Sequence, residues 1–274
     1  MSIDSTINAL MAKPAEYAVG TIFYAVPVEI GGSIAKVPLI VVWLIAAGLF
    51  FTLYLRFINL RGFRHACDLV RGKYSDPNCK GEVSHFQALA TALSGTVGLG
   101  NIAGVAVAIT MGGPGAAFWM VVAGFMGMSL KFAECVLGVK YRNENPDGTV
   151  SGGAMYYLTK GLPEVYPWLK EPAKVMAVLF AICCVGGALG GGNMFQVNQA
   201  YQQVVNVTGG SGTWLAQNAW AFGLFMAVLT GIVIIGGMKN IARVTDKLVP
   251  LMCGLYLLAG AVILVVACLK TGKA

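Results

Sequence analysis

The stretch Ser94-Gly95-Thr96-Val97-Gly98-Leu99-Gly100-Asn101 lies in the middle of an apolar run that extends from Phe86 to Met111. A helix needs about 20 apolar residues to cross a lipid bilayer, and this run is long enough. Its three glycines disfavour a continuous helix, because each glycine costs about 1 kcal/mol relative to alanine. Broken backbone at membrane depth is tolerated only where protein or a watery cavity satisfies its N–H and C=O groups. The stretch therefore predicts a ligand-binding break in a membrane-spanning helix.

The composition indicates an integral membrane protein. Hydrophobic residues make up 57% of the chain and charged residues only 11%, whereas a soluble domain carries about 25% charged residues. The net charge of +7 is typical of a membrane protein whose cytoplasmic loops are rich in lysine and arginine. No basic, aromatic-interleaved soluble segment is present, so we expect no binding of nucleic acid.

Six apolar segments are long enough to span the membrane, and they predict an all-α protein with six transmembrane helices. The expected spans are 37–57, 86–111, 115–139, 173–205, 215–236 and 248–269. Residues 1–36 are then an N-terminal segment outside the cell, residues 37–270 form the transmembrane domain, and residues 271–274 are a tail. We expect the bilayer itself to be the principal partner of this surface.

The distribution of basic residues predicts the orientation. The loops that follow the first, third and fifth spans hold 14 of the 19 lysines and arginines. Because cytoplasmic loops carry the excess of basic residues, these loops are expected in the cytoplasm. Both ends of the sequence then face outward.

The predicted break can serve two kinds of ligand. The second half-helix exposes N–H groups with a partial positive charge, which suit a carboxylate. The first half-helix ends in carbonyl oxygens around Ser94, Gly95 and Val97, which suit a small hard cation. Thr96 and Asn101 add a hydroxyl and an amide that are costly to bury without a partner.

The fourth apolar segment carries a second glycine cluster, Gly186 to Gly192, followed by Asn193 and Gln196. In an α-helix these two side chains share a face, so both are candidates for contact with a solute. An interhelical hydrogen bond, worth about 0.6 kcal/mol on average, explains them equally well. Similarly, Gly100 and Gly104 form a GxxxG pattern that favours close packing of two helices.

The sequence offers little support for an enzyme. It contains no combination of residues typical of a Ser-His-Asp triad or a metal-ligand cluster, and neither histidine lies within a predicted span. Lys131 and Glu134 are an intramembrane pair of opposite charge, and we interpret them as a structural ion pair near the interface. We therefore expect a non-enzyme without a bound cofactor.

Several motifs together resemble the alanine or glycine:cation symporter family. They are ATALSGTVGLGNIAG (90–104), GGPGAAFW (112–119), KFAE (131–134), GGAMYY (152–157) and GNMFQ (192–196). The resemblance covers nearly the whole chain. It implies a LeuT-type fold, in which two inverted five-helix repeats are here preceded by one extra helix. It also implies sodium-coupled symport of small neutral amino acids, alanine or glycine, across the inner (plasma) membrane of a bacterial cell.

The resemblance also assigns site residues. The solute would contact the broken helix and the fourth span, through Thr96, Gly98, Gly100, Asn193 and Gln196. Sodium, as the coupling ion, would be held by Ser94, Val97 and Asn101. The residues leave open whether alanine, glycine or serine is preferred, and whether the ion is sodium or a proton.

The number of spans departs from the family pattern. Members of the family have ten core helices, whereas six spans supply the extra helix and the first repeat only. We therefore expect a truncated product or a fragment that does not transport alone and requires the second repeat or a full-length partner. The alternative function is a transport-incompetent membrane fragment or a scaffold whose glycines only pack helices.

Overall fold

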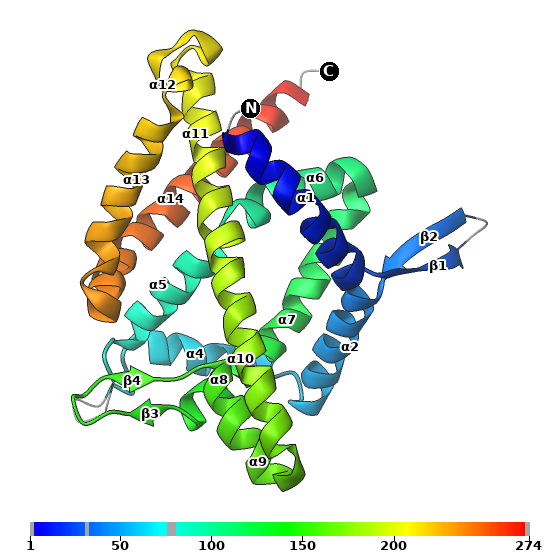
Figure 1. The fold of residues 1–274 in the computed structure, drawn as a ribbon, viewed down its shortest axis with the longest axis vertical. Coiled ribbons are helices and arrows are strands. Elements are labelled where there is room, and N and C mark those ends of the chain that lie inside the picture. Colours follow the sequence, from blue (N-terminus) through cyan, green and yellow to red (C-terminus); the bar gives the residue numbers. More distant parts are fainter. Residues whose placement is uncertain (1–2, 31–32, 76–80, 272–274) are drawn as a thin grey trace. The chain divides into compact units, whose positions relative to one another are not determined.

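The computed structural model describes residues 3–30, 33–75 and 81–271 and is mostly helical (Figure 1). The chain divides into two compact units. The first contains residues 1–63 and 114–135, and the second contains residues 64–113 and 136–274. Of the expected tail, 271–274, only Thr271 lies within the described residues.

The first unit contains a long N-terminal helix, a hairpin, an apolar helix and most of a second one. Its elements are α1 (Ile3–Ile22), β1 (Ala25–Ile30), β2 (Ser33–Pro38), α2 (Leu39–Tyr54), α3 (Ile58–Arg61) and the first part of α7 (Pro114–Lys140). Strands β1 and β2 pair antiparallel, with Ala25 opposite Pro38.

Small residues allow α2 to pack closely against α7 within this unit. A Cβ at Gly48 would lie 3.2 Å from the Cβ of Met126, and Thr52 and Ser129 are almost completely buried. The Asn59 side chain donates a hydrogen bond to a backbone carbonyl of α7. Such close approach at small residues is typical of helices that pack in a membrane.

The second unit holds the broken helix and most of the remaining helices. Its elements are α4 (Phe63–Val70), α5 (His85–Thr96), α6 (Leu99–Gly112), β3 (Asn143–Glu144), β4 (Val150–Ser151), α8 (Ala154–Tyr156), η1 (Tyr157–Gly161), α9 (Leu162–Val165), η2 (Pro167–Leu169), α10 (Lys170–Gly187), η3 (Ala188–Met194), α11 (Phe195–Thr208), η4 (Gly210–Gly212), α12 (Trp214–Gln217), α13 (Ala219–Ile234) and α14 (Gly237–Thr271). The segments η1 and η3 are π-helical, and η2 and η4 are 3₁₀ turns.

Three continuous helical segments in the described part of the chain are long and apolar enough to cross a membrane: 114–140, 167–208 and 237–270. The bent pair α5 and α6 makes a fourth candidate if it counts as one span. The apolar helices α2 and α13 have 16 residues each and are about 24 Å long, shorter than a hydrocarbon core of about 30 Å. The chain is thus an α-helical membrane protein with three or four clear candidate spans.

Two local features differ from the sequence prediction. Helix α14 already begins at Gly237, so Lys239, Arg243 and Lys247 lie in a helix and not in a loop. Its first turns contain no strong helix breaker after Gly237, and charged residues are compatible with a helix that emerges from the membrane. The second difference is the presence of two short hairpins beside the helices, β1–β2 and β3–β4.

The expected ion pair in α7 is present. The ammonium group of Lys131 lies 2.9 Å from the carboxylate of Glu134, and both side chains are more than half exposed. An exposed pair three residues apart on a helix contributes little to stability in water.

Candidate functional site

The broken helix has its break within the predicted stretch. Helix α5 ends at Thr96 and α6 begins at Leu99, and the two axes differ by 46°. Val97 and Gly98 between them have extended backbones. The extended conformation suits the β-branched valine, and the glycines at both sides weaken the helix.

The polar side chains at the break bond to the backbone of the same segment. The Ser94 hydroxyl donates to the carbonyl of Thr91 at 2.7 Å, and the Thr96 hydroxyl donates to that of Ala92 at 2.9 Å. The Asn101 amide donates to the Thr96 carbonyl at 3.2 Å. Asn101 thereby connects the two half-helices across the break.

Other backbone groups at the break are open. Within residues 81–271, no hydrogen bond is recorded for the carbonyl oxygens of Ser94 and Val97 or for the N–H group of Gly98. Carbonyl oxygens are hard ligands of the kind that binds sodium at unwound helices, and N–H groups at a half-helix start suit a carboxylate. The break therefore presents both kinds of group within a few residues.

Of the two candidate side chains on the fourth predicted span, Gln196 is the one that contacts the break. Its Oε1 atom accepts a hydrogen bond of 3.2 Å from the backbone N–H of Leu99, the first residue of α6. A Cβ atom at Gly98 would lie only 2.8 Å from the Gln196 Nε2 atom. Because extended backbone is open to any residue, Gly98 is favoured here by the close approach of Gln196 and not by its conformation.

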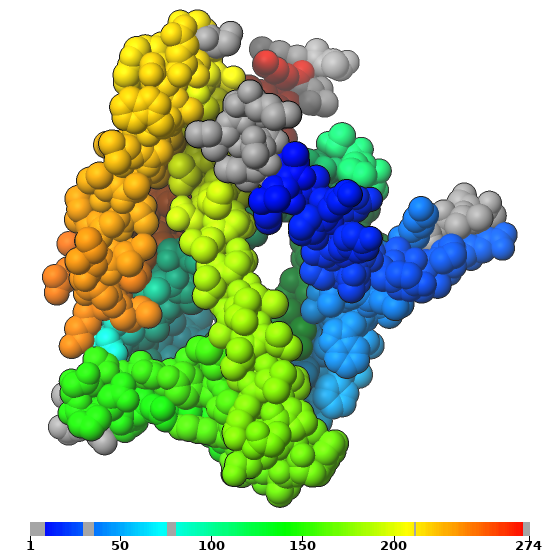
Figure 2. Space-filling view, in the orientation of Figure 1, coloured from blue at the N-terminus to red at the C-terminus, as the bar shows by residue number. Residues whose placement is uncertain are grey.

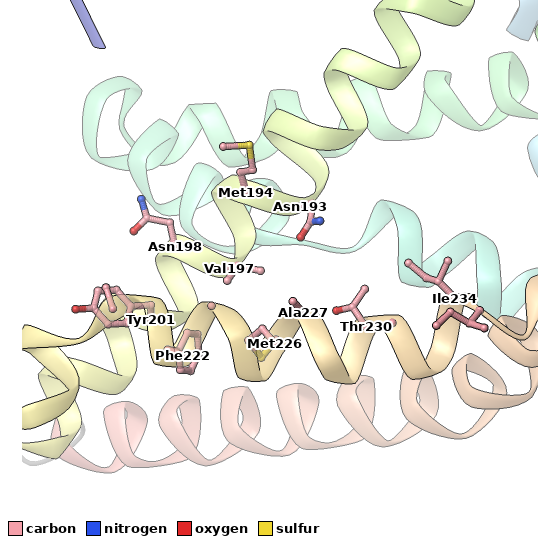
Figure 3. Close-up of a pocket in the computed structure, with 14 residues that line it drawn as sticks. Asn193, Met194, Val197, Asn198, Tyr201, Phe222, Met226, Ala227, Thr230 and Ile234 are labelled. Atoms are coloured by element: carbon pink, nitrogen blue, oxygen red, sulfur yellow. The ribbon is translucent and has the colours of Figure 1, made fainter. Parts of the chain in front are cut away.

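Asn193 lies in a different environment. It lines a groove of about 680 Å³ between α11 and α13, and no residue of the break lines that groove. Figure 3 shows Asn193, Asn198 and Tyr201 on α11 and the segment before it, with the α13 side chains opposite. The groove is mainly apolar, whereas the open polar groups lie at the break, so the break is the better candidate for a polar solute.

Asn193 and Gln196 face different neighbours. Asn193 belongs to the π-helical segment η3, and Gln196 lies in the α-helix that follows. Asn193 lines the groove together with Val197 and Tyr201, at α-helical spacing, whereas Gln196 contacts the break. Two residues three positions apart differ by about 60° around an α-helix, which is enough to direct the two side chains to different neighbours.

The GxxxG pattern of Gly100 and Gly104 contacts no other helix among the described residues. A Cβ added at Gly100 or Gly104 would meet no other atom within 4 Å among the described residues. No residue of α6 is buried. The described helices of this chain thus do not use these glycines for packing.

Comparison with known proteins identifies the family. The profile of the sodium:alanine symporter family matches residues 23–273. The chain belongs to this family. The family is one of transporters, so membership agrees with the expectation of a non-enzyme and with the resemblance seen in the motifs.

Curated relatives support the assignment. The sodium/alanine symporter AgcS of Methanococcus maripaludis is 42% identical over 227 residues, which are 83% of this chain and 48% of AgcS. The Bacillus subtilis proteins YflA, an uncharacterized transporter, and AlsT, an amino-acid carrier protein, are 38% and 32% identical over 84% and 82% of this chain. Those matches cover 45% of YflA and 46% of AlsT. The symporter-family chain thus spans about half the length of the relatives it matches.

A polar seam that the sequence analysis missed holds α5 of the symporter-family chain against α14. The Gln87 amide donates to the Asp246 carboxylate at 3.0 Å, and the hydroxyls of Thr91 and Thr245 are 3.1 Å apart. Of these residues, only those at the start of α5 lie in a sequence motif from which their structure could have been predicted. Ser84 and Gln87 form a capping box in the structure, and the spacing S-x-x-Q is the signature of that motif.

The β3–β4 hairpin contacts the segment that precedes α5. Glu82 accepts a hydrogen bond of 2.9 Å from the backbone N–H of Val150. Within the hairpin, the hydroxyl and backbone N–H of Thr149 both donate to the Asp147 carboxylate, and these bonds lower the pKa of Asp147. The hairpin therefore keeps a charged turn next to the start of the broken helix.

Proposed function

We propose that the chain forms the first-repeat part of a sodium-coupled symporter for small neutral amino acids, alanine or glycine, that works by alternating access. The observation that carries the proposal is the break in α5–α6, with open carbonyls before it and an open N–H group at it. Family membership supplies the transported class. The name of AgcS specifies sodium and alanine for that relative.

In this proposal the solute carboxylate binds at the start of α6. The N–H groups of Gly98 and Gly100 and the hydroxyl of Thr96 contact it, with favourable contribution from the half-helix dipole. The Gln196 oxygen now accepts the Leu99 N–H group, which shows that this N–H group is accessible to a polar oxygen. Gln196 then contacts the remaining polar groups of the solute, and Asn193, which lines the groove between α11 and α13, would have to turn toward the break to join it.

The cation site in this proposal is made of oxygen atoms. Among the described residues, no donor bonds to the carbonyls of Ser94 and Val97, and Asn101 contributes a side-chain oxygen. Sodium fits such a ligand set, as at other unwound membrane helices. The predicted spans contain no histidine, which favours sodium over a proton as the coupling ion.

The proposed arrangement places six spans in the plasma membrane of a bacterial cell. The three long candidate spans and the bent pair α5–α6 account for four of them. The short apolar helices α2 and α13 are the other two, and α2 is the extra helix before a LeuT-type repeat. Residues 1–36 lie outside, residues 37–270 form the membrane domain, and both ends of the sequence face outward. The segments that follow the first, third and fifth predicted spans hold 14 of the 19 lysines and arginines, and this bias supports the orientation.

Because the chain spans about half the length of its relatives, we assign to it one side of the solute site. The opposing side would come from a second repeat, as in the family pattern. We therefore expect proteoliposomes that contain this chain alone to accumulate no labelled alanine under an inward sodium gradient. Accumulation would contradict the assignment of half a site.

Binding to the purified chain tests the site itself. Titration calorimetry with alanine is expected to show weak binding in sodium chloride and none in choline chloride. Thr96→Val, which keeps the shape of the side chain, and Gly98→Leu, which fills the space of Gln196, should abolish the heat of binding. Gly104→Ala, on an open face of α6, is the matched control and should leave it unchanged. No sodium-dependent binding to the unmodified chain would favour a scaffold without transport function.

A further inference from the structure

A shallow groove between α10 and the segment α8–η1 lies at the base of the candidate span 167–208. It has a volume of about 460 Å³. One wall consists of Met155, Tyr156 and Thr159, and the other is a stripe along α10. Figure 2 shows the segment from α8 to α9 packed against the N-terminal part of α10, at the bottom of the view. None of these residues belongs to the proposed solute site.

The stripe on α10 changes from polar to apolar along the helix. It begins with Lys174, continues through Ala177 and Val178, and ends with Ala181 and Ile182. These positions repeat every three or four residues and so lie on one helix face. From Lys174 to Ile182 the stripe is about 12 Å long. One end of the groove is therefore cationic and the rest is lined by aliphatic side chains.

The polar end coincides with the level at which the helix loses its charges. Lys170, Glu171 and Lys174 lie in the first turns of α10, and no charged residue occurs from Val175 to Thr208. Lys174 therefore lies where the apolar part of the candidate span begins, which is the level of lipid headgroups. In the proposed arrangement this end faces the cytoplasm.

The groups around the polar end favour an anion. Lys174 pairs with Glu171 at 2.8 Å, but both side chains are more than half exposed, so the pair contributes little to stability and can be displaced. Lys160 does not line the groove, but its ammonium group lies 5.8 Å from the centre of the Tyr156 ring on the opposite wall and donates a hydrogen bond to Asn143, a neutral side chain. Basic pockets beside membrane helices on the cytoplasmic side are recognised sites for anionic headgroups.

We propose that this groove binds an anionic phospholipid of the cytoplasmic leaflet. Its phosphate contacts Lys174, and one acyl chain lies along Ala177, Val178, Ala181 and Ile182. Charge complementarity selects the lipid, and the aliphatic stripe holds its chain. The proposal rests on the membrane orientation of the proposed function but not on its solute site.

Native mass spectrometry of the purified chain tests the proposal. The chain is incubated in detergent with equal amounts of phosphatidylglycerol and phosphatidylcholine, and the retained lipids are counted. We expect phosphatidylglycerol to be retained preferentially. Lys174→Glu should lower its retention about fivefold or more, because it removes the ammonium group that contacts the phosphate in the groove, and such a contact contributes about 1 kcal/mol. Lys170→Glu changes the same charge on the same helix outside the groove and should leave retention nearly unchanged.

A second pair of variants tests the apolar part of the groove. Ala181→Trp fills it and should lower retention of both lipids, whereas Ala261→Trp on an exposed face of α14 should not; helix content measured by circular dichroism shows that both variants fold. Equal effects of the two lysine variants, or full retention by Ala181→Trp, would overturn the proposal. So would a dimer that Ala181→Trp dissociates, because a second copy would then occupy the groove. Alanine binding should be the same in all four variants, which separates this test from that of the solute site.

Discussion

The two halves of the broken helix are held in opposite ways. Helix α5 has Ala90 only 2% exposed against α14, where Ala242 is 0% exposed, and two side-chain hydrogen bonds connect the helices. Helix α6 has no buried residue. Apart from the Asn101 bond to Thr96 across the break, its hydrogen bond to another described helix is the one from Leu99 to Gln196. The half before the break is thus anchored within the chain, and the half after it is left accessible. This difference suits a site in which α6 adapts to a ligand while α5 stays in place.

The largest difference between the two half-helices is expected when one alanine in each is replaced by leucine. Ala90→Leu adds three heavy atoms to a filled seam and should destabilise the chain by about 1–3 kcal/mol, the cost of overpacking. Ala106→Leu on the exposed surface of α6 is the matched control and should have little effect. The midpoints of thermal unfolding in detergent measure both. Equal midpoints for the two variants would show that the seam is not packed as described.

The polar bonds of the seam should contribute less than its packing. Asp246→Ala removes the acceptor of the Gln87 amide and should cost about 1 kcal/mol, between the average of about 0.6 and the maximum of about 1.7 for interhelical bonds in membranes. One carboxylate oxygen of Asp246 is buried and has no partner within the described residues. Asp246→Asn keeps an acceptor oxygen and should therefore cost less than Asp246→Ala. Urea or thermal unfolding measures both, and the reverse order would contradict the bond assignment.

The hydrogen bond between Leu99 of α6 and Gln196 should stabilise the chain less than the bond between Gln87 and Asp246. A double-mutant cycle can measure it. Gln196→Ala should cost about 0.6 kcal/mol, and Gly98→Ala should cost a similar amount because its methyl group displaces the amide. In the Gln196→Ala background, Gly98→Ala should then have no further cost. Gly100→Ala, where a Cβ meets no atom within 4 Å, is the control and should be neutral or slightly stabilising, because alanine favours helix. Additive costs of the two variants would show that Gly98 and Gln196 act independently.

The sequence predicts those features that depend on neighbouring residues. The break at Val97 and Gly98 follows from glycine density. The capping box at Ser84 was not predicted, although its spacing could have indicated it. The pairing of Gln87 with Asp246 depends on residues 159 positions apart, and nothing in either local sequence indicates it. The different environments of Asn193 and Gln196 depend on which helices lie beside them, and the local sequence does not indicate those neighbours. The roles proposed for Asn193, Gln196 and the residues of the break in binding stay predictions.

The smallest expected effect is a change in the pKa of Asp147 in the β3–β4 hairpin, which contacts the segment before α5. Hydrogen bonds from Thr149 lower the pKa of Asp147, so the charged form is favoured in the folded hairpin. The resulting stabilisation is complete above the pKa of Asp147 in the unfolded chain and is lost as the pH falls through the lowered value. Thr149→Val removes the hydroxyl bond and should raise the pKa toward that of an ordinary aspartate, as measured by carboxyl carbon chemical shifts. Thr159→Val, whose hydroxyl bonds only to backbone carbonyls, should leave the titration of Asp147 unchanged.

Acid should therefore loosen the hairpin before it affects the break. Because Val150 of the hairpin donates to Glu82 ahead of α5, the protection of backbone amides against hydrogen exchange, relative to the intrinsic rate at each pH, should fall in acid at the start of α5 but not in α6. An equal loss of protection in both half-helices at the same pH would mean that the two are held by a common set of contacts. The contrast between an anchored α5 and an accessible α6 would then have to be abandoned.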